Sequence, residues 1–532
     1  MPRKSQKGPV PVIDLFAGPG GLSEGFASVV DERLGPRFRI ALSIEKDAVA
    51  HRTLKLRAFA RQFPHKELPE EYYSLLRQEI TEEELFESRP IEAAAATEES
   101  WCAELGKTRH DQVRERIRSL IGEQKSRPWV LIGGPPCQAY SLAGRSRNRG
   151  VKGYRLEKDE RHNLYEEYLR IIAAHWPPVF VMENVKGLLS TTVRDEHLFE
   201  RILSDLGDPG KALRRSADFT YAIHAIEPNN EGELFEGDSH GRFVVRAEKH
   251  GIPQRRHRLI LLGVRNDLGP IVPSALSEAE EIPARRVLKG LPSLRSGLSG
   301  DRGLFRDNGV DGHAWRSLFT FALDSRWVQG NAGIDERDRI STLVRKTMKR
   351  MPLPKAGRGG DFVPGEVTIE YKPRWFLDGR IEGACNHSSR EHMESDLFRY
   401  MFAACFANVN HRSPRLRDFP PDLLPAHENV HLAMNGGYFN DRFRVQLWDR
   451  PATTITSHIH KDGHYYIHPD PKQCRSLTVR EAARIQTFPD NYFFTGPRSE
   501  QYAQVGNAVP PLLARQIAEI VIDVLERSAM VG

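Results

Sequence analysis

The amino-acid sequence predicts an α/β fold built on a doubly wound, mostly parallel sheet, together with a second domain. Through the first half of the chain, short continuous apolar runs alternate with helical patterns, which is typical of parallel strands covered on both faces. After about residue 266 the alternation stops, and arginine, proline and aromatic residues become more frequent. A length of 532 residues leaves room for two or three domains.

The predicted strands are apolar runs that end in glycine or polar residues, at 10–18, 38–47, 129–136, 178–185 and 258–265. Helical patterns follow the first two strands at 21–30 and 48–59, and an amphipathic helix at 510–528 is expected to pack on the sheet. We therefore expect a first domain at 1–265 with a helical insertion at 58–128. A second domain is expected at 266–475, and residues 476–532 are expected to return to the first domain.

Charge, cysteine content and hydropathy limit the class of protein. The formal net charge of +6 permits a polyanionic partner without requiring one, and the basic runs at 345–350 and 411–417 fit either phosphate contacts or a plain solvated surface. Five scattered cysteines favour a reducing compartment over a disulfide framework. We find no finger-like spacing of metal ligands and no apolar stretch of signal or membrane-span length, and expect a cytosolic protein without a metal.

Ligands of a doubly wound sheet bind at the carboxyl ends of its strands, so those ends are the candidate site. The first strand ends in glycines, Gly18 and Gly20, which allow close approach of a ligand to the backbone. The dinucleotide fingerprint fails, because its third glycine would fall at Ser23. The second strand ends in Glu45, a carboxylate suited to ribose hydroxyls. A nucleoside ligand without a pyrophosphate suggests S-adenosylmethionine.

The third and fourth strand ends carry groups suited to covalent chemistry. Pro135 and Pro136 preset the turn that leads into Cys137, whose thiolate would be a nucleophile. The next strand ends in Glu183, followed by Asn184, and an acid beside a thiol suits attack on an electron-poor ring. The segment QRRHR before the last strand supplies arginines whose donor fork matches a carbonyl or a phosphate.

Six segments occur in the order of the conserved blocks of the DNA cytosine-5 methyltransferases, which the chain closely resembles. They are DLFAGPGGLSEGF, GGPPCQ, MENV, QRRHR, TVREAARIQTFP and QVGNAVPP, and they span residues 12 to about 518. The inserted 58–128 region and much of 266–450 are not covered. The resemblance implies the Rossmann-like fold of S-adenosylmethionine-dependent methyltransferases with a target-recognition domain at 266–475.

The resemblance also implies roles for individual residues. Cys137 resembles the nucleophile that adds to C6 of cytosine, and Glu183 the acid that engages N3 and the exocyclic amine. Arg258 resembles the residue that binds the base carbonyl, with Arg256 orienting the loop. The implied cofactor contacts are Phe16, Gly18, Gly20, Glu45, Pro136, Asn507 and Val509. The acid that meets the adenine amine in the family is usually an aspartate before isoleucine; here the nearest match is Glu79, which departs from that pattern.

A threonine-rich segment borders the recognition domain in this family. Thr453, Thr454 and Thr456 are therefore candidates for supporting a flipped nucleotide, or they are the alternating threonines of an ordinary strand. The base sequence that is recognised does not follow from side-chain types.

The implied activity is transfer of a methyl group to C5 of a specific cytosine in double-stranded DNA, with protection of host DNA beside a separately encoded restriction endonuclease. We expect a monomer in the bacterial cytosol, associated with the nucleoid. An RNA cytosine-5 methyltransferase and a non-catalytic DNA-binding module are the alternatives. The large second domain favours DNA over transfer RNA, and the intact cysteine, glutamate and arginine set favours an enzyme. A dehydrogenase fails on the missing third glycine.

Overall fold

The computed structural model describes residues 8–64, 67–122, 127–136, 164–193, 196–216, 218–228, 240–299, 312–329, 336–426, 430, 441–528 and 530. The chain divides into two compact units, each assembled from separate stretches of sequence. Unit 1 comprises residues 1–67, 86–280 and 508–532, and unit 2 comprises 68–85 and 281–507. Residues 476–507, expected to return to the first domain, therefore group with unit 2.

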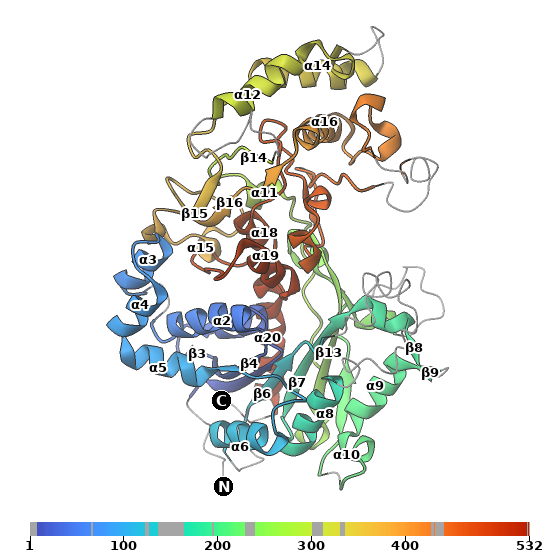
Figure 1. Cartoon of the computed structure of the whole chain (residues 1–532). Coiled ribbons are helices and arrows are strands. Elements are labelled where there is room, and N and C mark those ends of the chain that lie inside the picture. The colour runs from blue at the N-terminus through green and yellow to red at the C-terminus, as the bar shows by residue number, and fades with distance from the viewer. Residues whose placement is uncertain are drawn as a thin grey trace. The chain divides into compact units, whose positions relative to one another are not determined.

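Unit 1 is built on the sheet that the sequence predicts (Figure 1). Its strands in chain order are β1 (Val10–Leu15), β4 (Phe38–Glu45), β5 (Ser100–Cys102), β6 (Val130–Gly133), β7 (Val179–Val185), β10 (Tyr221–His224), β11 (Val244–Arg246) and β13 (His257–Arg265). Short strands outside it are β2 (Val30–Asp31), β3 (Gly35–Pro36), β8 (Thr192–Val193), β9 (Glu196–His197) and β12 (Gln254–Arg255). The helices are α1 (Gly21–Ala27), α2 (Ala48–Ala60), α5 (Pro90–Glu99), α6 (His110–Ile121), α8 (Leu164–His175), α9 (Leu198–Gly207), α10 (Pro209–Ala212) and α20 (Pro511–Arg527), and α4 (Glu82–Ser88) crosses the unit boundary.

The order of strands across the sheet is β10-β13-β7-β6-β1-β4-β5. Strands β5, β4, β1, β6 and β7 are mutually parallel, whereas β13 runs antiparallel to β7 and to β10. The chain proceeds from β1 outward to β5 and then returns to β6 on the other side of β1, so the strand order reverses between β1 and β6. Ligands of doubly wound sheets bind at such a switch point.

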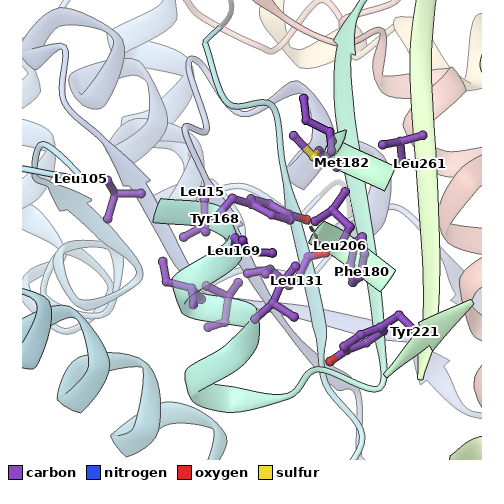
Figure 2. Close-up of a cluster of buried hydrophobic side chains, with 14 of the residues drawn as sticks. Leu15, Leu105, Leu131, Tyr168, Leu169, Phe180, Met182, Leu206, Tyr221 and Leu261 are labelled. Carbon is purple, nitrogen blue, oxygen red and sulfur yellow. Dashed lines mark hydrogen bonds between the residues drawn. The ribbon is translucent and has the colours of Figure 1, made fainter. Parts of the chain in front are cut away.

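Alternate residues of β1 serve the two faces of the sheet. Ile13 and Leu15 join a buried cluster with α6, α8 and α9. Figure 2 shows Leu15, Leu131, Phe180 and Met182 of three neighbouring strands meeting Tyr168 and Leu169 of α8. The Tyr168 hydroxyl donates to the carbonyl of Val181 over 2.9 Å, which ties α8 to the sheet. The opposite face carries α1, which packs on α20.

Unit 2 has its own core. Its helices are α3 (Glu70–Leu76), α11 (Arg285–Leu288), α12 (Gly312–Phe321), α13 (Arg326–Gln329), α14 (Glu336–Lys349), α15 (Pro373–Phe376), α16 (Glu394–Asn410), α18 (Val479–Ile485) and α19 (Arg498–Asn507). Its short strands are β14 (Gly297–Leu298), β15 (Gly359–Pro364), β16 (Gly383–Ser388), β17 (Glu391–His392) and β18 (Ala452–Thr453). Trp315, Phe319, Met348 and Tyr400 lie in one buried cluster formed by α12, α14 and α16. No helix in the described part of the chain is long and apolar enough to span a membrane.

Candidate functional site

The loop after β1 adopts a backbone conformation that its sequence permits. Gly18 and Gly20 have φ of 57° and 95°, in the left-handed region that glycine enters without strain. Phe16 has φ of 56°, which is uncommon for a residue with a side chain and marks a site held by its surroundings. A methyl group built on Gly18 would meet no atom within 4 Å, so the space beside the loop is open.

Glu45 fixes this loop to the end of β4. Its Oε2 accepts the N–H of Gly18 over 2.8 Å, and its Oε1 accepts the N–H of Asp47 over 2.8 Å. Burial raises the pKa of the Glu45 carboxyl, and these two N–H groups oppose that rise. A carboxylate can accept about four hydrogen bonds, so Glu45 can still accept one from a ligand at the mouth of the loop.

The first turn of α1 packs directly on the start of the final segment of unit 1. A methyl group on Gly21 would lie 2.2 Å from the carbonyl oxygen of Val509, so only glycine fits there. This contact places Val509 beside the glycine loop, where the sequence expects a cofactor contact. Asn507 belongs to unit 2 and is exposed.

Asp14, in the middle of the sheet beneath this loop, is completely buried. The Ser23 hydroxyl donates to Oδ2 of Asp14 over 2.5 Å, whereas Oδ1 has no hydrogen-bond partner among the residues that the structure describes. Burial raises the pKa of Asp14 to about 7, against the opposing effect of Ser23. The loop thus rests on a carboxyl group that changes charge near neutral pH.

The end of β6 lies against the end of β7. A methyl group on Gly134 would stand 3.0 Å from Oε2 of Glu183, so the glycine lets the turn pass close to that carboxylate. The Asn184 amide donates to the carbonyl of Pro135 over 3.4 Å. Pro136 is half-buried and is the last described residue before the predicted nucleophile. Cys137 itself lies outside the described residues.

Glu183 forms an ion pair with Arg258. Nε of Arg258 lies 3.0 Å from Oε1 of Glu183, and the two side chains are 18% and 13% exposed. The antiparallel pairing of β13 with β7 produces this contact, since Arg258 lies opposite Val185 and Ile260 opposite Glu183. A partly exposed acid and a guanidinium therefore stand together at the carboxyl end of β7.

The other predicted arginine has a different environment. Arg256 is 2% exposed, and its carbonyl accepts the N–H of Ala247 over 3.1 Å. Arg256 is thus a buried residue of the loop that leads into β13.

Comparison with known proteins identifies the family of a chain with this sheet and these strand ends. A family model described as the C-5 cytosine-specific DNA methylase matches residues 91–314 and 388–523. The chain is 33% identical to type II methyltransferase M.Bpa9945I of Bacillus paralicheniformis, over 97% of this chain and 99% of the relative. The chain belongs to the C-5 cytosine-specific DNA methylase family.

Further comparisons agree with this assignment. DNA (cytosine-5-)-methyltransferase M.ApeKI of Aeropyrum pernix is 27% identical, over 75% of this chain and 81% of the relative. A solved E. coli structure, described as a prophage-encoded DNA modification methyltransferase, has a TM-score of 0.50 at 17% identity and covers 97% of this chain and 99% of that one. That likeness concerns the fold. The protein is a DNA (cytosine-5-)-methyltransferase with an α/β methyltransferase fold.

A second pair braces Arg258. Nε2 of His257 lies 2.7 Å from Oε1 of Glu248, and Nη1 of Arg258 donates to the carbonyl of His257 over 2.9 Å. The imidazole lowers the pKa of Glu248 against the opposing effect of burial. This pair holds the backbone from which Arg258 projects. Sequence reasoning missed Glu248, because nothing in its local pattern sets it apart from other glutamates.

Glu79 is the residue that the sequence suggests for the adenine contact. It belongs to unit 2, is exposed, and its Oε1 accepts the Nε–H of Arg77 over 2.9 Å.

Sequence reasoning also missed β5, which pairs Glu45 with Cys102. The side chains at the end of β5 therefore lie next to Glu45. Three strand residues between helical patterns left no periodic signal by which to find them.

The threonine segment of unit 2 is held by its own hydrogen bonds. The hydroxyl of Thr453 donates to Oε1 of Gln446 over 3.1 Å, and that of Thr456 lies 3.0 Å from the hydroxyl of Tyr466. A methyl group on Gly506 would stand 2.2 Å from the amide nitrogen of Ser457, so α19 packs tightly on this segment.

Within the described residues, no group of three or more histidine, cysteine, aspartate or glutamate side chains is placed to hold a metal ion.

Proposed function

We propose that this methylase transfers a methyl group from S-adenosylmethionine to C5 of a specific cytosine in double-stranded DNA through a covalent bond between Cys137 and C6. The observation that carries the proposal is the Glu183–Arg258 pair. It stands against the Gly134–Pro136 turn, which leads directly into Cys137. The chain thereby brings an acid and a donor fork to the turn that precedes its predicted nucleophile.

The chemistry of cytosine matches this pair. The base presents O2, N3 and the exocyclic amine along one edge. Nε of Arg258 and Oε1 of Glu183 lie 3.0 Å apart, so the guanidinium can donate to O2 while the neighbouring carboxyl group engages N3 and the amine. A protonated N3 would draw electron density from C6 and favour attack by a thiolate there.

The proposed steps balance with the residues present. The Cys137 thiolate adds to C6 while Glu183 delivers a proton to N3, and the ring becomes an enamine that is nucleophilic at C5. When bound, S-adenosylmethionine supplies the electrophilic methyl carbon that C5 takes. Loss of the C5 proton to a base, either water or a side chain, then expels the thiolate. Return of the N3 proton to Glu183 restores the neutral aromatic ring and the acid.

The glycine loop fits an adenosine-bearing methyl donor. The space beside Gly18 is open, and Glu45 keeps acceptor lone pairs at the mouth of the loop for ribose hydroxyls. Phe16 and Val509 border the same loop, and we assign them, with Gly20 and Pro136, to cofactor contacts. Asn507 and Glu79 keep the same assignment, with Glu79 proposed for the adenine amine.

The base has to leave the duplex before it can meet Cys137, and extrusion costs a few kcal/mol. We assign recognition of the surrounding sequence to residues 266–475, with the threonines at 453, 454 and 456 supporting the extruded nucleotide. Several relatives are named type II methyltransferases. On that basis we infer that the methylase protects host DNA against a separately encoded restriction endonuclease. That it acts as a monomer, in the bacterial cytosol at the nucleoid, is part of the same proposal.

Trapping the covalent intermediate tests this proposal. A duplex that carries 5-fluorocytosine at the target site cannot lose its C5 substituent, so incubation with S-adenosylmethionine should leave a cross-linked peptide that contains Cys137. The Cys137→Ser variant should form no adduct and no methylated product while it still binds duplex DNA and S-adenosylhomocysteine. Normal turnover by that variant would overturn the mechanism. Methylation of transfer RNA in place of duplex DNA would overturn the substrate.

A further inference from the structure

Helix α14 (Glu336–Lys349) of unit 2 is a firmly anchored helix. Ile340, Val344 and Met348 lie on one side of it and are at most 5% exposed. They belong to the cluster that also contains Trp315 of α12 and Tyr400 of α16. An interior face of this kind fixes the direction in which the opposite face points. Figure 1 shows α12 and α14 above α16, and α14 contacts both α12 and α16.

The outer face of α14 is cationic. The exposed residues of the helix and its end include Arg339, Lys346, Lys349 and Arg350, which recur at helical spacing on one side. Among the residues that the structure describes, none of the four has an ion-pair partner. The neighbouring helices add exposed Arg316 of α12 and Arg326 of α13.

Positive charge is concentrated in this part of the chain. Residues 339–355 contain six lysines or arginines and no acidic residue. Residues 312–355 hold nine basic and four acidic residues, a net charge of +5, against +6 for the whole chain. The stretch from α12 to the end of α14 is therefore strongly basic.

The helix dipole alone does not account for this face. Cations in the last turn of α14 are favoured by the partial negative charge there, but the effect is confined to that turn. Arg339 lies near the other end of the helix, and Arg316 lies on another helix. The interaction of cations with the C-terminal end of α14 therefore does not explain Arg339 or Arg316.

We propose that the outer face of α14 binds the phosphate backbone of duplex DNA, an inference that rests on the proposed function. From residue 339 to 350 the helix rises about 16 Å, enough to follow several phosphates of one strand. Lysine and arginine at that face supply the charge without contacting bases, so this helix positions the duplex and carries no sequence information. Anchoring by Ile340, Val344 and Met348 keeps the face in place as DNA arrives.

A charge-matched pair of triple variants tests this. The first is Lys346→Ala/Lys349→Ala/Arg350→Ala on α14. The control, Arg33→Ala/Lys211→Ala/Arg215→Ala, removes the same net charge from exposed positions scattered over unit 1. Binding of the full-length protein to a duplex that contains its target site is measured over a range of salt concentrations. Thermal unfolding confirms that both variants are folded.

The α14 triple should bind the duplex roughly tenfold or more weakly, and its slope of log K against log salt should fall by up to about 3, because each lost phosphate contact contributes about 0.9. The control should stay close to the wild type. Equal behaviour of the two variants would overturn the assignment of α14, while the wild type still methylates DNA. A wild-type protein that neither binds nor methylates any duplex would overturn the proposed function instead.

Discussion

Three carboxyl groups near the ends of the unit 1 strands have different surroundings. Asp14 is fully buried against one serine hydroxyl, Glu45 is held by two backbone N–H groups, and Glu183 faces a guanidinium. Burial without a cation raises a carboxyl pKa, whereas N–H donors oppose that rise. Residue type alone would make these acids equivalent, so the difference between them arises from their neighbours.

Asp14 should make the stability of the methylase depend on pH. Its pKa rises from 3.8 to about 7 on folding, so the native state binds a proton that the unfolded chain has released. The free energy of unfolding should therefore fall by about 1.4 kcal/mol per pH unit as pH rises between these values, and the contribution should level off above pH 7.

The Asp14→Asn variant tests this, because its side chain does not titrate. Denaturant unfolding at intervals from pH 5 to 8 should show a flatter pH dependence for the variant than for the wild type. The difference between the two slopes isolates Asp14 from the other titrating groups. Parallel curves would show that this carboxyl group does not gain a proton on folding.

Glu183 should be needed for turnover more than for binding. In Glu183→Gln the amide still forms hydrogen bonds but cannot deliver a proton to N3, so kcat should fall by about 100-fold or more with duplex affinity nearly retained. Glu115→Gln, an exposed change on α6, is the matched control and should keep normal kcat. An unchanged rate for Glu183→Gln would remove the acid from the mechanism.

At the scale of elements, the block TVREAARIQTFP forms a helix whose arginines are buried. The block forms helix α18, and Thr478 and Glu481 form a capping box at its start. Its arginines are buried: Arg480 donates to carbonyls of Cys385 and Tyr492, and Arg484 pairs with Asp490 over 2.6 Å. This block therefore stabilises the interior of unit 2. The sequence alone does not show that its two arginines are buried.

The contact between α1 and α20 depends on a glycine. A methyl group on Gly25 would lie 2.4 Å from Cβ of Ala514 and 2.6 Å from the carbonyl oxygen of Pro511. Gly25→Ala should force the helices apart and lower the free energy of unfolding by about 1–3 kcal/mol.

Gly241→Ala is the control for that change, since a methyl group there meets no atom within 4 Å. Chemical denaturation of both variants gives the comparison. If Gly25→Ala were as stable as Gly241→Ala, α1 and α20 would be able to move apart without loss of unfolding free energy.

At the scale of the whole molecule, each unit has its own hydrophobic core although the chain enters unit 2 twice. The proposed cofactor loop, with Phe16, Glu45 and Val509, lies wholly in unit 1. A ligand that binds only the folded state raises the stability of that state by mass action.

S-adenosylhomocysteine, which keeps the adenosine group of the cofactor, should therefore stabilise unit 1. At a concentration 100 times its Kd it should add about 2.7 kcal/mol and raise the transition seen by calorimetry. Glu45→Ala should lose most of this gain, because the variant lacks the acceptor for the ribose and the anchor of Gly18. A full shift in that variant would place the cofactor elsewhere.

The local sequence pattern alone predicted most strands of the sheet, the family and several candidate site residues. Apolar runs and glycine punctuation identified β1, β4, β6, β7 and β13, since strand burial depends on side chains that are neighbours along the chain. The order of motifs identified the family. The acidic and arginine residues at the strand ends could be predicted as site residues, because parallel strands bring their carboxyl ends to one edge of the sheet.

Tertiary structure decided what depends on residues distant in sequence. The antiparallel direction of β13 sets Arg258 against Glu183, and β5 was found only by its pairing with β4. The bracing of His257 by Glu248, the pKa of Asp14 and the exposed cationic face of α14 were likewise decided by folding. Each arises from which groups packing brings together or leaves in solvent, and a linear pattern does not contain that information.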